Sequence, residues 1–176
     1  FRRVLFRSTT RETQGLSGSV EAGTYGTARA TVSGGLRTDR WALGLSAAGL
    51  RSDGVSKADE DDANRERDGI DAWTVSGSAR LQATAAVRLE ARLRLSDSRT
   101  EVDGYVLPAF TLGDTAEVAK SRSTSGLLRA TVDGPLGFEH QLSLSAYAID
   151  LGQTGGAVFD YDADRQVWRW QRSEEH

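Results

Sequence analysis

The sequence predicts an all-β protein: about eight strands of a larger antiparallel, up-and-down transmembrane β-barrel. Three observations predict this fold, namely one long strand with two contrasting sides, seven similar segments, and connectors that alternate in length. Val87–Ser96, VRLEARLRLS, sets aliphatic residues on one side and three arginines and a glutamate on the other. Soluble strands usually contain about 5–6 residues, whereas a tilted membrane-spanning strand needs about 9–11. This length and contrast favour lipid on one side and water on the other.

Four expected strands precede this segment: Leu16–Thr24, Ala28–Leu36, Trp41–Leu50 and Trp73–Leu81. In the first two, small and aliphatic residues alternate with serine, threonine and charged residues, and Gly26 between them permits a tight turn. The third and fourth each begin with a tryptophan on the side of the aliphatic residues. All four therefore have the period of two that a half-buried strand requires.

Three expected strands follow: Ser123–Val132, Phe138–Ile149 and Val158–Gln171. Leu127 blurs the alternation of the first, whereas Phe138–Ile149 alternates throughout. Asp133–Gly137, DGPLG, has the composition of a turn. Val158–Gln171 has no single apolar side, because Trp168 and Trp170 fall opposite the aromatic residues at its start.

The connectors from the second strand onward alternate in length. The short ones are Thr38–Arg40, Ala83–Ala86 and Asp133–Gly137; the longer ones are Arg51–Asp71, Asp97–Lys120 and Asp150–Gly156. Outer-membrane barrels have short periplasmic turns and longer extracellular loops. We therefore expect the longer connectors outside the cell and the bacterial outer membrane as the location.

The two ends of the sequence are related to each other. Val4–Ser8 reads VLFRS and Arg172–His176 reads RSEEH. The codons GTG CTC TTC CGA TCT encode the first, and their reverse complement encodes the second. We therefore expect residues 1–8 and 172–176 to be translated sequencing adapter, and the natural chain to continue beyond both ends.

Composition excludes several classes. Hydrophobic residues make up 38% of the 176 residues, and no apolar run approaches the about 18 residues of a membrane helix. Nineteen glycines and no cysteine fit many turns without a disulfide framework. The net charge of −3 is small and mixed, which argues against a nucleic-acid partner.

The alternation also predicts which residues meet lipid and which meet water. The expected lipid-interface girdle is Trp41, Trp73, Phe138, Trp168 and Trp170. The expected lumen-facing residues are Arg29, Arg80, Arg88, Glu90, Arg92 and Arg94. His140 falls on the lipid side, and no serine has a base suggested beside it. We therefore expect no enzyme activity.

Several motifs together resemble a known family. SVEAGTYGTARATVSGG, WALGLSAAGLRSDGVSKADEDDANRERDGI and LRLSDSRTEVDGY resemble the first barrel strands of TonB-dependent outer-membrane receptors, most closely the cobalamin-receptor-like branch. TTRETQ, residues 9–14, is similar to the end of the plug that fills such barrels, which leaves 15–171 as barrel. The resemblance implies a plugged barrel of the 22-stranded class. It implies uptake of a scarce nutrient, of the cobalamin or iron-siderophore type, driven by the TonB energy-coupling protein. The partners would then be membrane lipid, the plug, that protein and a small-molecule nutrient.

The same resemblance implies calcium in the extracellular loops. SDSRTEVDG resembles a segment that supplies two aspartates, here Asp97 and Asp103, and RDG resembles one that supplies Asp68. Glu66 stands where a further aspartate is expected, and Asp53 is a weaker match. Carboxylate oxygens suit this hard cation. The alternative is a solvated, partly salt-bridged acidic loop. No other cofactor is expected.

Two other protein classes remain open at this point. A passive outer-membrane porin or an adhesin-type barrel shares the alternation but has no plug. A soluble β-sandwich would predict shorter strands and packing of hydrophobic residues between two sheets.

Overall fold

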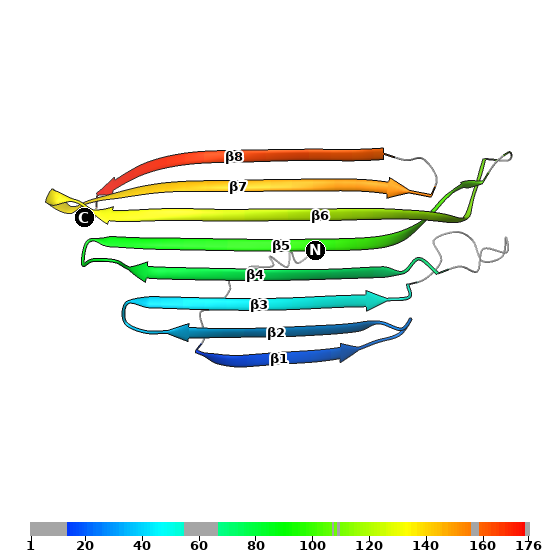
Figure 1. Cartoon of the computed structure of the whole chain (residues 1–176), viewed down its shortest axis with the longest axis horizontal. Helices are drawn as coiled ribbons and strands as arrows, with labels where there is room; N and C mark the ends of the chain where they lie inside the picture. The colour runs from blue at the N-terminus through cyan, green and yellow to red at the C-terminus, as the bar shows by residue number, and fades with distance from the viewer. Residues whose placement is uncertain (1–13, 55–66, 107, 109, 156–158, 175–176) are drawn as a thin grey trace, which may run out of the picture.

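The eight strands form one antiparallel sheet in chain order (Figure 1). The computed structural model describes residues 14–54, 67–106, 108, 110–155 and 159–174. The strands are β1 (Gly15–Ala22), β2 (Ala28–Arg37), β3 (Trp41–Ser52), β4 (Ile70–Gln82), β5 (Val87–Val106), β6 (Thr111–Asp133), β7 (Phe138–Thr154) and β8 (Phe159–Glu174). The predicted all-β, up-and-down antiparallel fold is confirmed. The sheet is open, with β1 and β8 as its two edges, so the larger barrel of which these would be about eight strands stays a prediction.

Short turns join the strands at one end of the sheet, which we call the inner end. They lie at residues 38–40, 83–86 and 134–137, as predicted, and the last contains a short 3₁₀ turn, Pro135–Gly137. The opposite, outer end carries the connections from β1 to β2, β3 to β4, β5 to β6 and β7 to β8 (Figure 1).

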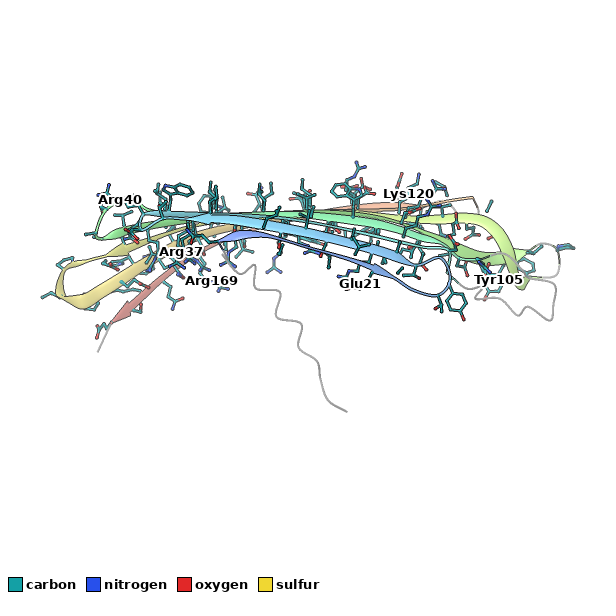
Figure 2. All side chains as sticks on the ribbon, turned by 90° about the horizontal axis from the view of Figure 1, so that it is seen from below. Glu21, Arg37, Arg40, Tyr105, Lys120 and Arg169 are labelled. Atoms are coloured by element: carbon teal, nitrogen blue, oxygen red, sulfur yellow. The ribbon has the colours of Figure 1, made fainter. Side chains whose placement is uncertain are left out.

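The register sorts the side chains onto two faces. Residues that pair directly across an antiparallel ladder point to the same side, and such a set of paired residues is called a row below. The apolar face holds the rows of Val87, Leu89, Ala91 and Leu93. The arginine face holds the alternate rows, those of Arg88, Glu90, Arg92 and Arg94. In Figure 2 Lys120, from the apolar face, lies on one side of the ribbon, and Glu21, Arg37 and Arg169, from the arginine face, lie on the other. Strand β1 and the inner ends of β7 and β8 bend toward the arginine side.

The sheet has no hydrophobic core. Within the described residues Ala42 is the one buried hydrophobic residue, and no large side chain is fully buried. Leucines in the middle of the apolar face remain exposed, with Leu45 at 67% and Leu93 at 51%. A single layer cannot bury such a face by itself, because an amphipathic sheet needs a second layer, or a nonaqueous surrounding, on its apolar side.

Two predicted loops are corrected. Asp97–Lys120 was expected to be a long loop, but β5 continues to Val106 and β6 begins at Thr111, so most of it is a hairpin that extends from the outer end. Asp150–Gly156 was also expected to be a loop, but β7 continues to Thr154. Both extensions mix polar and scattered apolar residues without a continuous apolar side, so they lack the one-sided pattern by which strands are recognised.

The expected adapter and plug segments fall mostly outside the described residues. This applies to residues 1–8, to 9–13 and to the last two residues of the chain. Gln14 is described, and its side-chain Nε2 donates a hydrogen bond of 2.9 Å to the carbonyl oxygen of Arg37. Residues 172–174 continue β8, opposite residues 138–140 of β7.

Candidate functional site

An apolar belt crosses the middle of the apolar face. It covers nine residues of each central strand, for example Trp73–Leu81 in β4 and Val87–Leu95 in β5, the latter lying two residues nearer the inner end. Eight steps of about 3.3 Å give about 27 Å along a strand. A tilt of about 35–45° reduces this to about 20 Å of thickness, close to the roughly 25 Å apolar band of outer-membrane barrels.

All four tryptophans of the chain lie on this face. Trp41 and Trp170 belong to one row at the inner edge of the belt, Trp168 to the next row, and Trp73 to the outer edge. Phe138 lies on the same face, at the inner end of β7. The five residues expected to form a girdle therefore share the apolar face, and their contact with lipid stays a prediction.

Two ring contacts stiffen the inner end of this face. The ring of His140 stacks on Trp170, with centroids 6.1 Å apart and planes 19° from parallel. The guanidinium carbon of Arg172 lies 3.6 Å from the ring centroid of Phe138, a cation–π contact. His140 thus lies against an aromatic ring, consistent with a structural role on the belt's edge.

Charged rows close the belt at the outer end. In the row of Trp73, Asp97 faces Arg122, and Nε of Arg122 donates to Oδ2 of Asp97 at 3.0 Å. In the next row Arg51 and Asp71 approach to 3.9 Å. Along β4 and β5 this face changes from apolar to charged residues within two positions. Any apolar medium that covers the belt would therefore have to end at these rows.

The centre of the ion-pair network on the arginine face is Glu90 of β5. Nε of Arg80 donates to its Oε1 and Nη1 of Arg129 to its Oε2, each at 3.2 Å. The three residues occupy one row on adjacent strands, and the Glu90 side chain is 13% exposed. One carboxylate therefore bridges two arginines and fixes the register of β4, β5 and β6.

Replacing Glu90 with glutamine is expected to destabilise the sheet by about 1–3 kcal/mol, because it leaves two guanidiniums without their counter-ion. The two arginine side chains are about a third exposed, so the loss of stability should be smaller than for a fully buried ion pair. The measurement is the urea midpoint of the chain refolded in detergent micelles. Glu21→Gln on β1 is the matched control, since Glu21 has no ion pair within the described part of the chain. Equal midpoint shifts in both variants would contradict the bridging role.

All six residues expected to face a lumen lie on the arginine face. Between the row of Arg88 and the row of Arg29, this face holds nine arginines and two carboxylates. The carboxylates belong to Glu21 and Glu90. The arginines are Arg29, Arg37, Arg80, Arg88, Arg92, Arg94, Arg129, Arg165 and Arg169.

Sequence reasoning missed four of the charged residues that matter here. Arg129 completes the bridge at Glu90, and Glu139 accepts from Nη2 of Arg88 at 3.5 Å. The alternation in the predicted strands Ser123–Val132 and Phe138–Ile149 could have assigned Arg129 and Glu139 to the arginine face. Arg165 and Arg169 belong to β8, whose outer half has aspartates on the apolar face, so that no apolar side shows its parity.

The expected calcium ligands are only partly described, and they are not brought to one place. Asp53 follows β3 and Asp68 precedes β4, both at the outer end, whereas Glu66 lies outside the described residues. Asp97 lies in the middle of β5, six residues and thus about 20 Å from Asp103. Among the residues that the structure describes, no three acidic or histidine side chains are grouped so that they could hold a metal ion. The calcium site stays a prediction.

No protein-family model matches this chain, and no curated protein matches it. Within the described ranges, no helix is long and apolar enough to cross a membrane.

Proposed function

We propose that the chain is part of an outer-membrane β-barrel, with the apolar face against lipid and the arginine face toward a wet interior. The observation that carries this proposal is the exposed apolar belt of a single-layer sheet, closed by charged rows at its outer edge. Exposed apolar surface of this extent is costly in water, and lipid removes that cost. A sandwich would need a second sheet over the belt, and none occurs in the described part of the chain.

Within this class we propose a TonB-dependent receptor that takes up a scarce nutrient through a plugged barrel. The support is the resemblance of the strand and loop motifs, together with a strand length that suits a membrane. The plug, the energy-coupling protein and a small-molecule nutrient of the cobalamin or iron-siderophore type would be the partners. The barrel's task would be capture and passage, with no bond in the nutrient broken.

A passive porin or an adhesin-type barrel is the second candidate. Hydroxyl and arginine side chains cover the arginine face, and such a face suits a water-filled channel as well as a plugged one. The residues that resemble a plug are 9–14, and of these the structure describes Gln14 alone.

The experiment that separates the two is the sequence of the gene upstream of the codon for Thr9. A receptor predicts a signal peptide, a short energy-coupling segment and a plug of roughly 100–150 residues, the size of an ordinary domain. A signal peptide directly before Thr9, with no plug, would overturn the receptor and leave the porin or adhesin.

A further inference from the structure

Positive charge on the arginine face exceeds what the carboxylates there can neutralise. The chain as a whole carries −3, yet the region between the rows of Arg88 and Arg29 has nine arginines against two glutamates. A third carboxylate, Glu139, lies just beyond the row of Arg88 and, within the described residues, pairs with Arg88 alone. Glu90 is already shared by two arginines, and Glu21 lies on the edge strand β1. The surplus is therefore concentrated on one face of the sheet, and like charges so placed repel one another.

Three of these arginines lack a counter-ion within the described residues: Arg92 and Arg94 on β5, in the middle of the sheet, and Arg165 on the edge strand β8, three strands away. Arg92 and Arg94 follow Glu90 along β5, and Arg165 shares the row of Arg94. In the described part of the chain, none of the three side chains forms an ion pair or a hydrogen bond. The rows of Arg92 and Arg94 contain no carboxylate. Arg92 and Arg94 start about 7 Å apart, within reach of one multivalent anion.

Hydroxyl groups surround these arginines. The row of Arg94 also holds Ser17, Ser33, Ser46, Ser76, Ser125 and Tyr147. The hydroxyls of Ser17 and Ser33, at the β1 edge of the row, share a hydrogen bond of 2.8 Å. The hydroxyl of Ser78, directly opposite Arg92, is buried and has no partner within the described residues.

A hollow of about 920 Å³ lies over this part of the sheet, lined by Arg92, Arg94, Arg165 and the hydroxyls around them. Binding sites for small organic molecules have volumes of roughly 300–1,000 Å³. The hollow is open on the side away from the sheet, so a solute would enter it from the solvent in front of the arginine face.

We propose that this hollow binds a small multivalent anion through carboxylate or phosphate groups, with Arg92, Arg94 and Arg165 as the charged donors. Guanidinium groups pair with both kinds of oxyanion through two parallel hydrogen bonds, and serine hydroxyls add neutral donors around them. The proposal deepens the proposed function and rests on it in one respect, that the arginine face is wet.

The test is calorimetric titration of the full chain, folded in detergent micelles at low salt, with citrate and with pyrophosphate. Arg92→Gln combined with Arg94→Gln should weaken binding at least tenfold, because each lost guanidinium removes a charge-assisted pair. The matched control is Arg99→Gln combined with Lys120→Gln, which removes the same charge from one row of the apolar face. The control should stay within twofold of the unchanged chain, and circular dichroism should show the same strand content in all three proteins.

Binding of citrate alone, of pyrophosphate alone or of both supports the site and tells which oxyanion it takes. No binding of either anion, or equal loss in both double variants, would overturn it. Binding of a polyglutamate peptide but of neither small anion would also overturn it, in favour of a polypeptide occupant. If the chain still inserts into lipid vesicles while citrate and pyrophosphate fail to bind, the anion site fails and the barrel stands.

Discussion

Replacing Leu93 with arginine is expected to make folding into a bilayer less favourable by about 2–4 kcal/mol. Leu93 lies four residues from the row of Trp41 and four from the row of Trp73, at the middle of the apolar belt. A charge there would have to enter hydrocarbon, whereas near either edge it would reach water. The measurement is urea-dependent folding into phosphatidylcholine vesicles, followed by tryptophan fluorescence.

Ala48→Arg is the matched control for this variant. Ala48 lies on the arginine face, in the row of Ser96 and outside the hollow around Arg94. A new arginine there enters the wet side and should change the folding free energy by less than about 0.5 kcal/mol. Equal losses in the two variants would contradict the assignment of faces. Folding of the unchanged chain to a monomer without lipid or detergent would contradict the membrane location altogether.

Alternation predicted the belt because a strand with one side in an apolar surrounding and the other in water has apolar residues at every second position. Leu89, Leu93 and their row partners show this, and the register places them on one face. The same rule failed beyond Ser96, where the ladder of β5 and β6 continues but neither side is continuously apolar. Backbone pairing in that hairpin does not depend on an apolar side, so no composition signal marks its strands.

The bridge at Glu90 was beyond prediction for a different reason. Alternation gives the face of Glu90 and of Arg129, but their contact depends on which residues lie opposite each other. The register of β4 against β5 depends on the turn at 83–86, and that of β5 against β6 depends on the connection between Val106 and Thr111. A shift of one residue would move a strand's side chains to the other face. The extension of β5 was beyond prediction in the same way: Asp97 and Asp103 were expected in a loop, and both lie in this strand, with a β-bulge at Asp103.

Depth measurements on the tryptophans should show two edges and an apolar face between them. In variants that keep one tryptophan and replace the others with phenylalanine, lipids brominated near the headgroup should quench Trp41 and Trp73 more strongly than lipids brominated near the chain end. The reason is that these two residues lie in the outermost rows of the belt, eight residues apart. Trp168 lies on the same face as Trp41, in the next row toward the middle of the belt. Lipids brominated near the chain end should therefore quench Trp168 more strongly than they quench Trp41.

Tyr147→Trp, with the four native tryptophans replaced by phenylalanine, supplies the matched control. Tyr147 is 44% exposed and lies on the arginine face, in the row of Arg94. It should escape quenching by brominated lipid and be quenched by acrylamide in water. Lipid quenching of this residue as strong as that of Trp41 would mean that both faces meet lipid, which a barrel forbids. If none of the tryptophans is quenched, protein rather than lipid covers the apolar face, because a dry protein contact is the other surrounding that stabilises an exposed belt of leucines.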